Sequence, residues 1–165
     1  MSLDADIRLL SRVQLFAGFE HDHLRLLAFG AETRRYIAGD RIYREGSASD
    51  GGYVISSGHV ELISGRDDRT VTSHTNGSLI SELGLITETL HAATAVATQE
   101  TEVLRISRPL FLRMLNEYPH LARLLQSRLV SSVEEFSRQL AVIRAKLDHA
   151  TDLATRKPKV AKTGD

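Results

Sequence analysis

The chain has 165 residues, of which 42% are hydrophobic and 25% are charged, and its 21 basic residues balance 21 acidic ones. This composition is ordinary for a single globular domain with a hydrophobic core. A formal net charge of zero gives no general attraction to nucleic acid or to acidic membranes. The lack of cysteine excludes disulfides, thiol catalysis and iron–sulfur ligation.

The N-terminus carries no targeting signal of the secretory type. Its first residues, Met1–Ile7, are acidic where a signal peptide needs basic side chains. No apolar run reaches the roughly 18–20 residues that span a bilayer. The sequence therefore predicts a cytoplasmic protein with no membrane partner.

Apolar residues recur at helical spacing in two segments at the start of the chain. The first is about Leu3–Arg12, with Ser2 or Asp4 as its cap, and the second is about His21–Phe29. We therefore expect two N-terminal helices before the pattern changes.

From Ala31 to Arg105 the chain consists of short alternating or β-branched runs that glycines interrupt at roughly 8–12-residue intervals, a pattern typical of a β-sandwich or barrel. Hairpin turns are expected at Ser56–Gly58 and at Gly65–Asp68. The expected strands are Glu32–Tyr36, Arg41–Tyr43, Gly52–Ser56, His59–Ile63, Thr70–His74, Ala92–Ala97 and Glu102–Ile106.

One stretch, Gly77–Ile86, interrupts the strands with a glycine turn, a polar Ser81-Glu82 pair and one short helical turn. The start of a helix presents unpaired N–H groups, which favour an anion, and Gly84 would let backbone approach closely there. Ser81 is expected to cap this turn through its hydroxyl. Apolar residues of the stretch, such as Ile80 and Leu85, are expected in the core more than on a ligand.

Several short motifs stand in the order and at the spacing of one known family. They are Val13-Gln-Leu-Phe-Ala-Gly18, Ala38-Gly-Asp40, Glu45-Gly46, Tyr53-Val-Ile-Ser-Ser-Gly58, Gly77, Glu82-Leu-Gly-Leu85, Ala93-Thr94 and Phe111. On this ordered set, the chain from about Val13 to about Arg128 resembles the cyclic nucleotide-binding domain family, the sensor domain of catabolite-activator-like regulators, protein kinase A regulatory subunits and gated channels.

The resemblance implies an α+β fold, in which an antiparallel β-barrel or jelly roll (a double-stranded β-helix) is flanked by N-terminal helices and a long C-terminal dimerisation helix. It also implies a ligand, cyclic AMP or cyclic GMP, whose ribose 2′-hydroxyl would bond Glu82 and whose phosphate would lie after the short helix. The implied ligand-binding residues are Ile80, Ser81, Glu82, Leu83, Gly84, His91, Ala92 and Ala93.

The sequence departs from the family at two of these positions. Ser81 stands where the family has glycine, and His91 stands where it has the arginine that pairs with phosphate. A largely neutral imidazole cannot replace two charge-assisted bonds, so affinity should fall by about ten- to a hundred-fold. A weakened or altered nucleotide site and an empty one both remain open. If His91 touches phosphate, affinity should rise as pH falls through about 6.5.

After the barrel, a helix should begin at Ser107-Arg-Pro109 and end near Pro119, and a longer helix should run from His120 to about His149. Six apolar residues alternate at spacings of four and three, the pattern of a coiled-coil seam, which predicts a homodimer. They are Leu129, Val133, Phe136, Leu140, Ile143 and Leu147. By the resemblance, Val133, Phe136 and Ser137 would cap the purine.

The predicted organisation has four parts: N-terminal helices (1–30), the β-barrel (31–106), C-terminal helices (107–150) and a disordered basic tail (151–165). Catabolite-activator-like regulators continue into a winged helix, and only the tail follows here, so direct DNA binding is not expected. An unidentified effector protein would receive the signal.

Three functions are compatible with different parts of this pattern. The first is a non-enzymatic sensory and regulatory module for signal transduction. The second is a dimerisation or protein-interaction scaffold with a degenerate, empty pocket, in which Leu90 or His91 fills the phosphate space. The third, a cupin-like metalloenzyme using His59, His74 and His91, lacks the required ligand spacing. We therefore predict no catalytic residue, no metal and no cofactor apart from a cyclic nucleotide ligand.

Overall fold

The computed structural model describes residues 2–65, 69–128 and 145. Residues Met1–Ala122 form one compact unit, and the chain from Arg123 onward forms another. In the part that the structure describes, no helix is long and apolar enough to cross a membrane.

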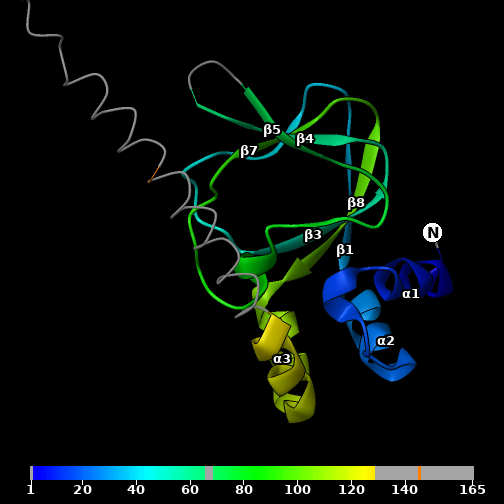
Figure 1. Cartoon of the computed structure of the whole chain (residues 1–165). Coiled ribbons are helices and arrows are strands. Elements are labelled where there is room, and N and C mark those ends of the chain that lie inside the picture. The colour runs from blue at the N-terminus through cyan, green and yellow to red at the C-terminus, as the bar shows by residue number, and fades with distance from the viewer. Residues whose placement is uncertain (1, 66–68, 129–144, 146–165) are drawn as a thin grey trace, which may run out of the picture. The chain divides into compact units, whose positions relative to one another are not determined.

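Eight strands form two four-stranded antiparallel sheets (Figure 1). One sheet has the order β1-β8-β3-β6 and the other has the order β2-β7-β4-β5. The strands are β1 (Glu32–Tyr36), β2 (Arg41–Tyr43), β3 (Gly51–Ser57), β4 (Val60–Ser64), β5 (Arg69–His74), β6 (Leu79–Ile80), β7 (Thr94–Ala97) and β8 (Thr101–Ser107). This arrangement confirms the predicted antiparallel sandwich of jelly-roll type.

The core between the sheets follows from strand periodicity. Side chains that point inward alternate with polar ones, and the inward set is almost free of solvent. Both sheets contribute to this cluster, which consists of Ile42, Tyr53, Ile55, Val60, Ile80, Ala95 and Val103. The fold therefore buries apolar residues from strands that are distant in sequence.

Three helices and a 3-10 turn gather at one end of the strands: α1 (Leu3–Ser11), η1 (Gln14–Phe16), α2 (His21–Gly30) and α3 (Arg108–Glu117) (Figure 1). Ser2 caps α1 by accepting a 3.2 Å hydrogen bond from the Ala5 amide, and Ser107 caps α3. The fully buried rings of Phe16 and Phe111 lie 6.0 Å apart and join η1 to α3. The predicted caps and helix positions are confirmed.

Two local expectations are wrong. The Ser56–Gly58 segment is not a hairpin turn, because β3 and β4 belong to different sheets. Gly58 has φ +96°, and a Cβ atom on it would lie 2.6 Å from the Glu100 carbonyl oxygen. The chain therefore passes from one sheet to the other at Gly58, in close contact with the turn that precedes β8. The strand expected from Ala92 begins at Thr94, because residues before it pair with the β2–β3 loop instead.

The predicted long helix lies mostly outside the described residues. Residues 119–128 are helical. The seam residues Leu129, Val133, Phe136, Leu140, Ile143 and Leu147, the purine cap of Val133, Phe136 and Ser137, and the tail 151–165 all lie outside the described part. The four-part division of the chain stays a prediction.

Candidate functional site

The expected anion-binding stretch folds as η2 (Glu82–Leu85), a short 3-10 helix between β6 and β7. Its N-cap residue, Ser81, has φ 61° and ψ 42°, and no other non-glycine residue in the described part has a positive φ. This left-handed conformation costs a residue with a side chain about 1–2 kcal/mol. The backbone thus keeps a shape that glycine adopts freely, although the residue is serine.

The expectation that the Ser81 hydroxyl caps the helix is wrong. No hydrogen bond runs from an η2 amide to this side chain. Side-chain caps need an extended N-cap residue, and the left-handed backbone of Ser81 aims the hydroxyl elsewhere. Its Oγ atom lies 3.5 Å from Nδ1 of His91, at the outer limit of a hydrogen bond. The serine is therefore oriented toward the histidine, ten residues later.

Gly84 brings η2 against the beginning of β3. A Cβ atom at this position would lie 2.4 Å from the Gly51 carbonyl oxygen and 3.1 Å from Cβ of Ser49. Such distances leave no room for any side chain, so the predicted close backbone approach at Gly84 is confirmed. The position of η2 is consequently set by backbone contact with β3.

Arg108, the first residue of α3, ties the same two segments together. Its Nε atom donates to the Gly84 carbonyl at 3.0 Å, and its Nη2 atom donates to the Ser49 carbonyl at 2.6 Å. Charge-assisted bonds of this kind are among the stronger hydrogen bonds in proteins. Arg108 therefore couples the start of α3 to η2 and to the β2–β3 loop.

His91 is buried, with 8% of its surface exposed, and two elements hold it. Its amide donates to the Ser47 carbonyl at 2.9 Å, and its carbonyl accepts from the Gly46 amide at 2.8 Å. Its imidazole stacks on the Tyr43 ring, with centroids 3.7 Å apart and planes 11° from parallel. The ring is thus fixed between β2 and Ser81.

Lost hydration shifts the pKa of both titratable groups in this stretch. Burial lowers the pKa of His91, although nearby Asp50 acts in the opposite direction, so the imidazole is neutral at pH 7. Glu82 is exposed by area, yet the protein that surrounds its carboxyl group desolvates it enough to raise its pKa. Burial therefore disfavours the charged form of both side chains.

The remaining predicted site residues fall into two groups. Ile80 is 2% exposed and belongs to the core between the sheets, where core packing was expected. Leu83 is 47% exposed, and Ala92 is also exposed, while Ala93 is buried. Leu90 is 70% exposed and fills no buried space, so that part of the empty-pocket hypothesis is wrong. Ser81, Gly84 and His91 converge from the two sides of this stretch.

Sequence reasoning missed Tyr43, Ser49 and Arg108. Tyr43 meets His91 because β2 pairs with β7, a long-range contact that no local motif encodes. Ser49 Oγ accepts from the Thr89 amide at 3.0 Å and holds the segment before His91. The Ser107-Arg-Pro109 sequence predicts a helix start, which is confirmed, but it gives no sign of the bonds that Arg108 makes to Gly84 and Ser49.

The three histidines of the metalloenzyme hypothesis do not form a metal site. Nε2 of His74 lies 2.9 Å from the Thr72 hydroxyl, and His91 is stacked on Tyr43. In the described part of the chain, no three side chains of metal-ligand type lie close enough together to hold an ion. The observed contacts are hydrogen bonds and ring packing.

Two antiparallel sheets of jelly-roll type, with a left-handed turn at Ser81 between β6 and β7, define the fold of this domain. The sequence model of the cyclic nucleotide-binding domain matches residues 33–118. The chain belongs to this family.

Known relatives agree with this assignment. A cyclic nucleotide-binding-like protein from Brucella abortus is 43% identical, with a TM-score of 0.61 and coverage of 67% of this chain and 97% of that one. The cyclic AMP receptor protein of Thermus thermophilus is 28% identical over 132 residues, which cover 78% of this chain and 61% of the relative. A cAMP-dependent protein kinase regulatory subunit of Blastocladiella emersonii is 28% identical over 133 residues, which cover 75% of this chain and 33% of the relative. The chain thus spans less than two thirds of either curated relative.

Proposed function

We propose that this chain is a non-enzymatic regulatory module that binds a small nucleotide-type anion, with cyclic AMP or cyclic GMP as the first candidates, at a weakened Ser81–His91 site. The observation that carries the proposal is the convergence of Ser81 and His91 beside a turn that keeps a glycine-like backbone, in a chain of this family. A non-glycine residue held in a strained, left-handed conformation suggests a functional constraint.

In this proposal the phosphate lies near Ser81, His91 and Ala92, and the ribose hydroxyl bonds Glu82. The neutral, buried imidazole offers one hydrogen bond, whereas a guanidinium offers two parallel charged ones. Losing charge-assisted bonds costs about 1.5–3 kcal/mol, which corresponds to about ten- to a hundred-fold in affinity. The site should therefore bind weakly and respond to acid, because protonation of His91 adds the missing charge.

Calorimetric titration and thermal shift with cyclic AMP and cyclic GMP test this function. Ligand at a hundred times its dissociation constant should add about 2.7 kcal/mol to the unfolding free energy. His91→Arg should tighten binding by about ten- to a hundred-fold. His21→Arg makes the same chemical change at an exposed position on α2 and should leave affinity unchanged. Equal affinity of His91→Arg and wild type would remove His91 from the phosphate site.

A second candidate is a scaffold with an empty pocket. It is favoured by the stacking of the neutral His91 ring on Tyr43, which gives the imidazole a structural role without any ligand. In that case neither wild type nor His91→Arg should show saturable binding of either nucleotide. His91→Ala should also destabilise the fold, since it would remove the stacked ring.

We further propose that the module is a cytoplasmic homodimer that signals to an effector protein through its C-terminal helix. The support is the alternating spacing of the six apolar seam residues from Leu129 to Leu147. Light scattering on the full chain should give twice the monomer mass. Leu140→Glu, within the seam, should shift the mass to that of the monomer, whereas Gln139→Glu, outside it, should not. A monomeric wild type would contradict this part of the proposal.

A further inference from the structure

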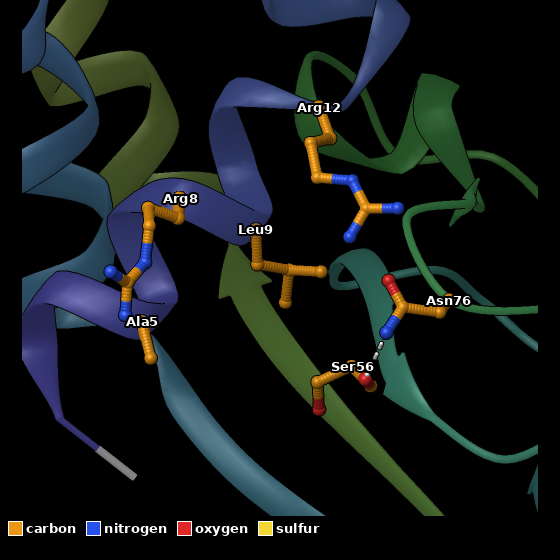
Figure 2. A pocket seen from close by; sticks show the side chains of 6 residues that line it. All are labelled: Ala5, Arg8, Leu9, Arg12, Ser56 and Asn76. Atoms are coloured by element: carbon orange, nitrogen blue, oxygen red, sulfur yellow. Dashed lines mark hydrogen bonds between the residues drawn. The ribbon is translucent and has the colours of Figure 1, made fainter.

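A pocket of about 320 Å³ lies between α1 and one side of the β-sandwich (Figure 2). Residues of α1 and its C-cap line one wall, and β3 with the β5–β6 turn lines the other. The lining consists of Ala5, Arg8, Leu9, Arg12, Ser56 and Asn76. We name it the Arg8–Arg12 pocket. None of its residues belongs to the Ser81–His91 site.

The two arginines of this pocket carry charges that face solvent. Arg8 and Arg12 are both exposed and lie one helical turn apart. Within residues 2–65, 69–128 and 145, neither guanidinium forms an ion pair or a hydrogen bond, although Asp4 precedes Arg8 at a spacing that permits one. By contrast, several other arginines have a carboxylate or carbonyl partner: Arg34, Arg35, Arg105, Arg108 and Arg113.

Like charges one turn apart repel each other, so this pair disfavours the empty pocket slightly. An anion between the two guanidinium groups would remove the repulsion and supply the missing partner. Arginine side chains match the oxygens of phosphate in a bidentate geometry. The charge arrangement therefore selects for a ligand with a compact, doubly charged group.

The opposite wall is polar and held in place. Asn76 Nδ2 donates to the Ser56 carbonyl at 2.8 Å, and the Ser56 hydroxyl donates to the Glu102 carbonyl at 2.9 Å. Figure 2 shows the Arg12 guanidinium directed across the pocket toward Asn76, while Arg8 extends toward Ala5. The Asn76 amide has a second N–H to offer to a ligand. Arg8 is exposed, and rotation about its own side-chain bonds would be required to bring its guanidinium to the same anion.

We propose that the Arg8–Arg12 pocket binds the phosphate dianion of a small molecule, with Arg12 and Asn76 as the principal contacts and Arg8 as the second charge. Its volume is at the lower end of small-molecule sites, which are about 300–1,000 Å³. Leu9 and Ala5 supply an apolar wall for a short organic part. Free phosphate and a phosphomonoester share the required chemistry, since both carry most of two charges at neutral pH.

Titration of the full chain followed by nuclear magnetic resonance tests this site directly. The probes are inorganic phosphate, glycerol 3-phosphate and, as a neutral control, glycerol. We expect saturable shifts of the Arg12 and Arg8 Nε–H signals and of the Asn76 side-chain amide, with either phosphate probe and not with glycerol. Tighter binding of glycerol 3-phosphate identifies an ester as the ligand type, and equal binding identifies the phosphate ion itself.

Variants separate a built site from general charge attraction. Arg12→Ala should weaken binding by about ten-fold or more, and Arg12→Lys should recover part of the loss, because it restores charge without the planar fork. Arg25→Ala removes one exposed positive charge from α2 and should leave binding unchanged. The absence of saturable shifts with either phosphate probe, or an equal loss in Arg25→Ala and Arg12→Ala, would overturn the proposal. A failure here leaves nucleotide binding at His91 untouched, since the two sites share no residue.

Discussion

Replacing Gly84 with alanine tests whether backbone contact with β3 sets the position of η2. The added Cβ atom would lie 2.4 Å from the Gly51 carbonyl oxygen, well inside the contact distance. Gly51 has little room to retreat, because it pairs with Ser107 of β8, and its own added Cβ would lie 2.1 Å from the Ile106 carbonyl oxygen. The clash is therefore between two backbone segments that are both fixed.

The expected cost follows from two opposing effects. Overpacking a well-packed site costs about 1–3 kcal/mol, and contact with fixed backbone favours the upper part of that range. Replacing glycine by alanine where φ is not positive returns about 0.4–1 kcal/mol by restricting the unfolded chain. Gly84→Ala should thus lower the free energy of unfolding by about 1–2 kcal/mol.

Urea unfolding followed by circular dichroism measures this difference. Gly30→Ala is the matched control, because its added Cβ would meet only the flexible end of the Leu110 side chain, at 2.7 Å. Its unfolding free energy should stay within about 0.5 kcal/mol of wild type, as for substitutions without a fixed clash. If Gly84→Ala is as stable as wild type, and Gly30→Ala is also unchanged, then close backbone contact between η2 and β3 does not set the position of η2.

Three further outcomes are expected. Burial lowers the pKa of folded His91 below 6.5, so on acidification the unfolded chain binds a proton at a higher pH than the folded chain does. The wild type should therefore lose stability relative to His91→Gln as pH falls below about 6.5. An unchanged difference in unfolding free energy between the two proteins across this pH range would contradict the prediction. Arg108→Ala leaves two carbonyl groups without a donor and should cost about 2–3 kcal/mol in chemical unfolding, whereas Arg113→Ala, at an exposed pair, should cost under about 1 kcal/mol. Burial raises the pKa of Asp6, whose Oδ1 atom has no hydrogen-bond partner within the described residues, so ionisation of the carboxyl group destabilises the fold as pH rises above about 3.8. Asp6→Asn should therefore raise the melting temperature at about pH 7 more than at about pH 3. An equal change at both pH values would contradict the charge effect.

Much of the fold was predictable because its signals are local. The bounds of β1 and β2 match the predicted Glu32–Tyr36 and Arg41–Tyr43, since alternation and nearby glycines mark strand ends. The caps at Ser2 and Ser107 were readable from single residues next to helical patterns. The change of sheet at Gly58 could not be predicted, because the sequence of a glycine turn is the same whether or not the two flanking strands pair with each other.

The candidate site was predictable only in part. Glu82, Gly84 and His91 were found from their order and spacing, yet the roles of Ser81 and Arg108 were not. A serine directly before a short helical turn predicts an N-cap. In the structure Ser81 has a left-handed backbone and makes no capping bond, and η2 lies in close backbone contact with β3 at Gly84. The pKa of His91 likewise depends on burial and on stacking against Tyr43, which belongs to another strand.

The amino-acid sequence alone determined most of the strands and helices, the family, and the exchange of a guanidinium for an imidazole at the position expected to meet phosphate; the short strand β6 (Leu79–Ile80) was not among the predicted ones. Each of these depends on residue type and short-range spacing. Only the tertiary structure decided that Ser81 turns toward His91, that Arg108 joins α3 to η2, and that Arg12 faces Asn76 across a pocket that Arg8 also lines. These contacts join residues far apart in the chain, and burial and geometry arise only when the sheets and helices pack.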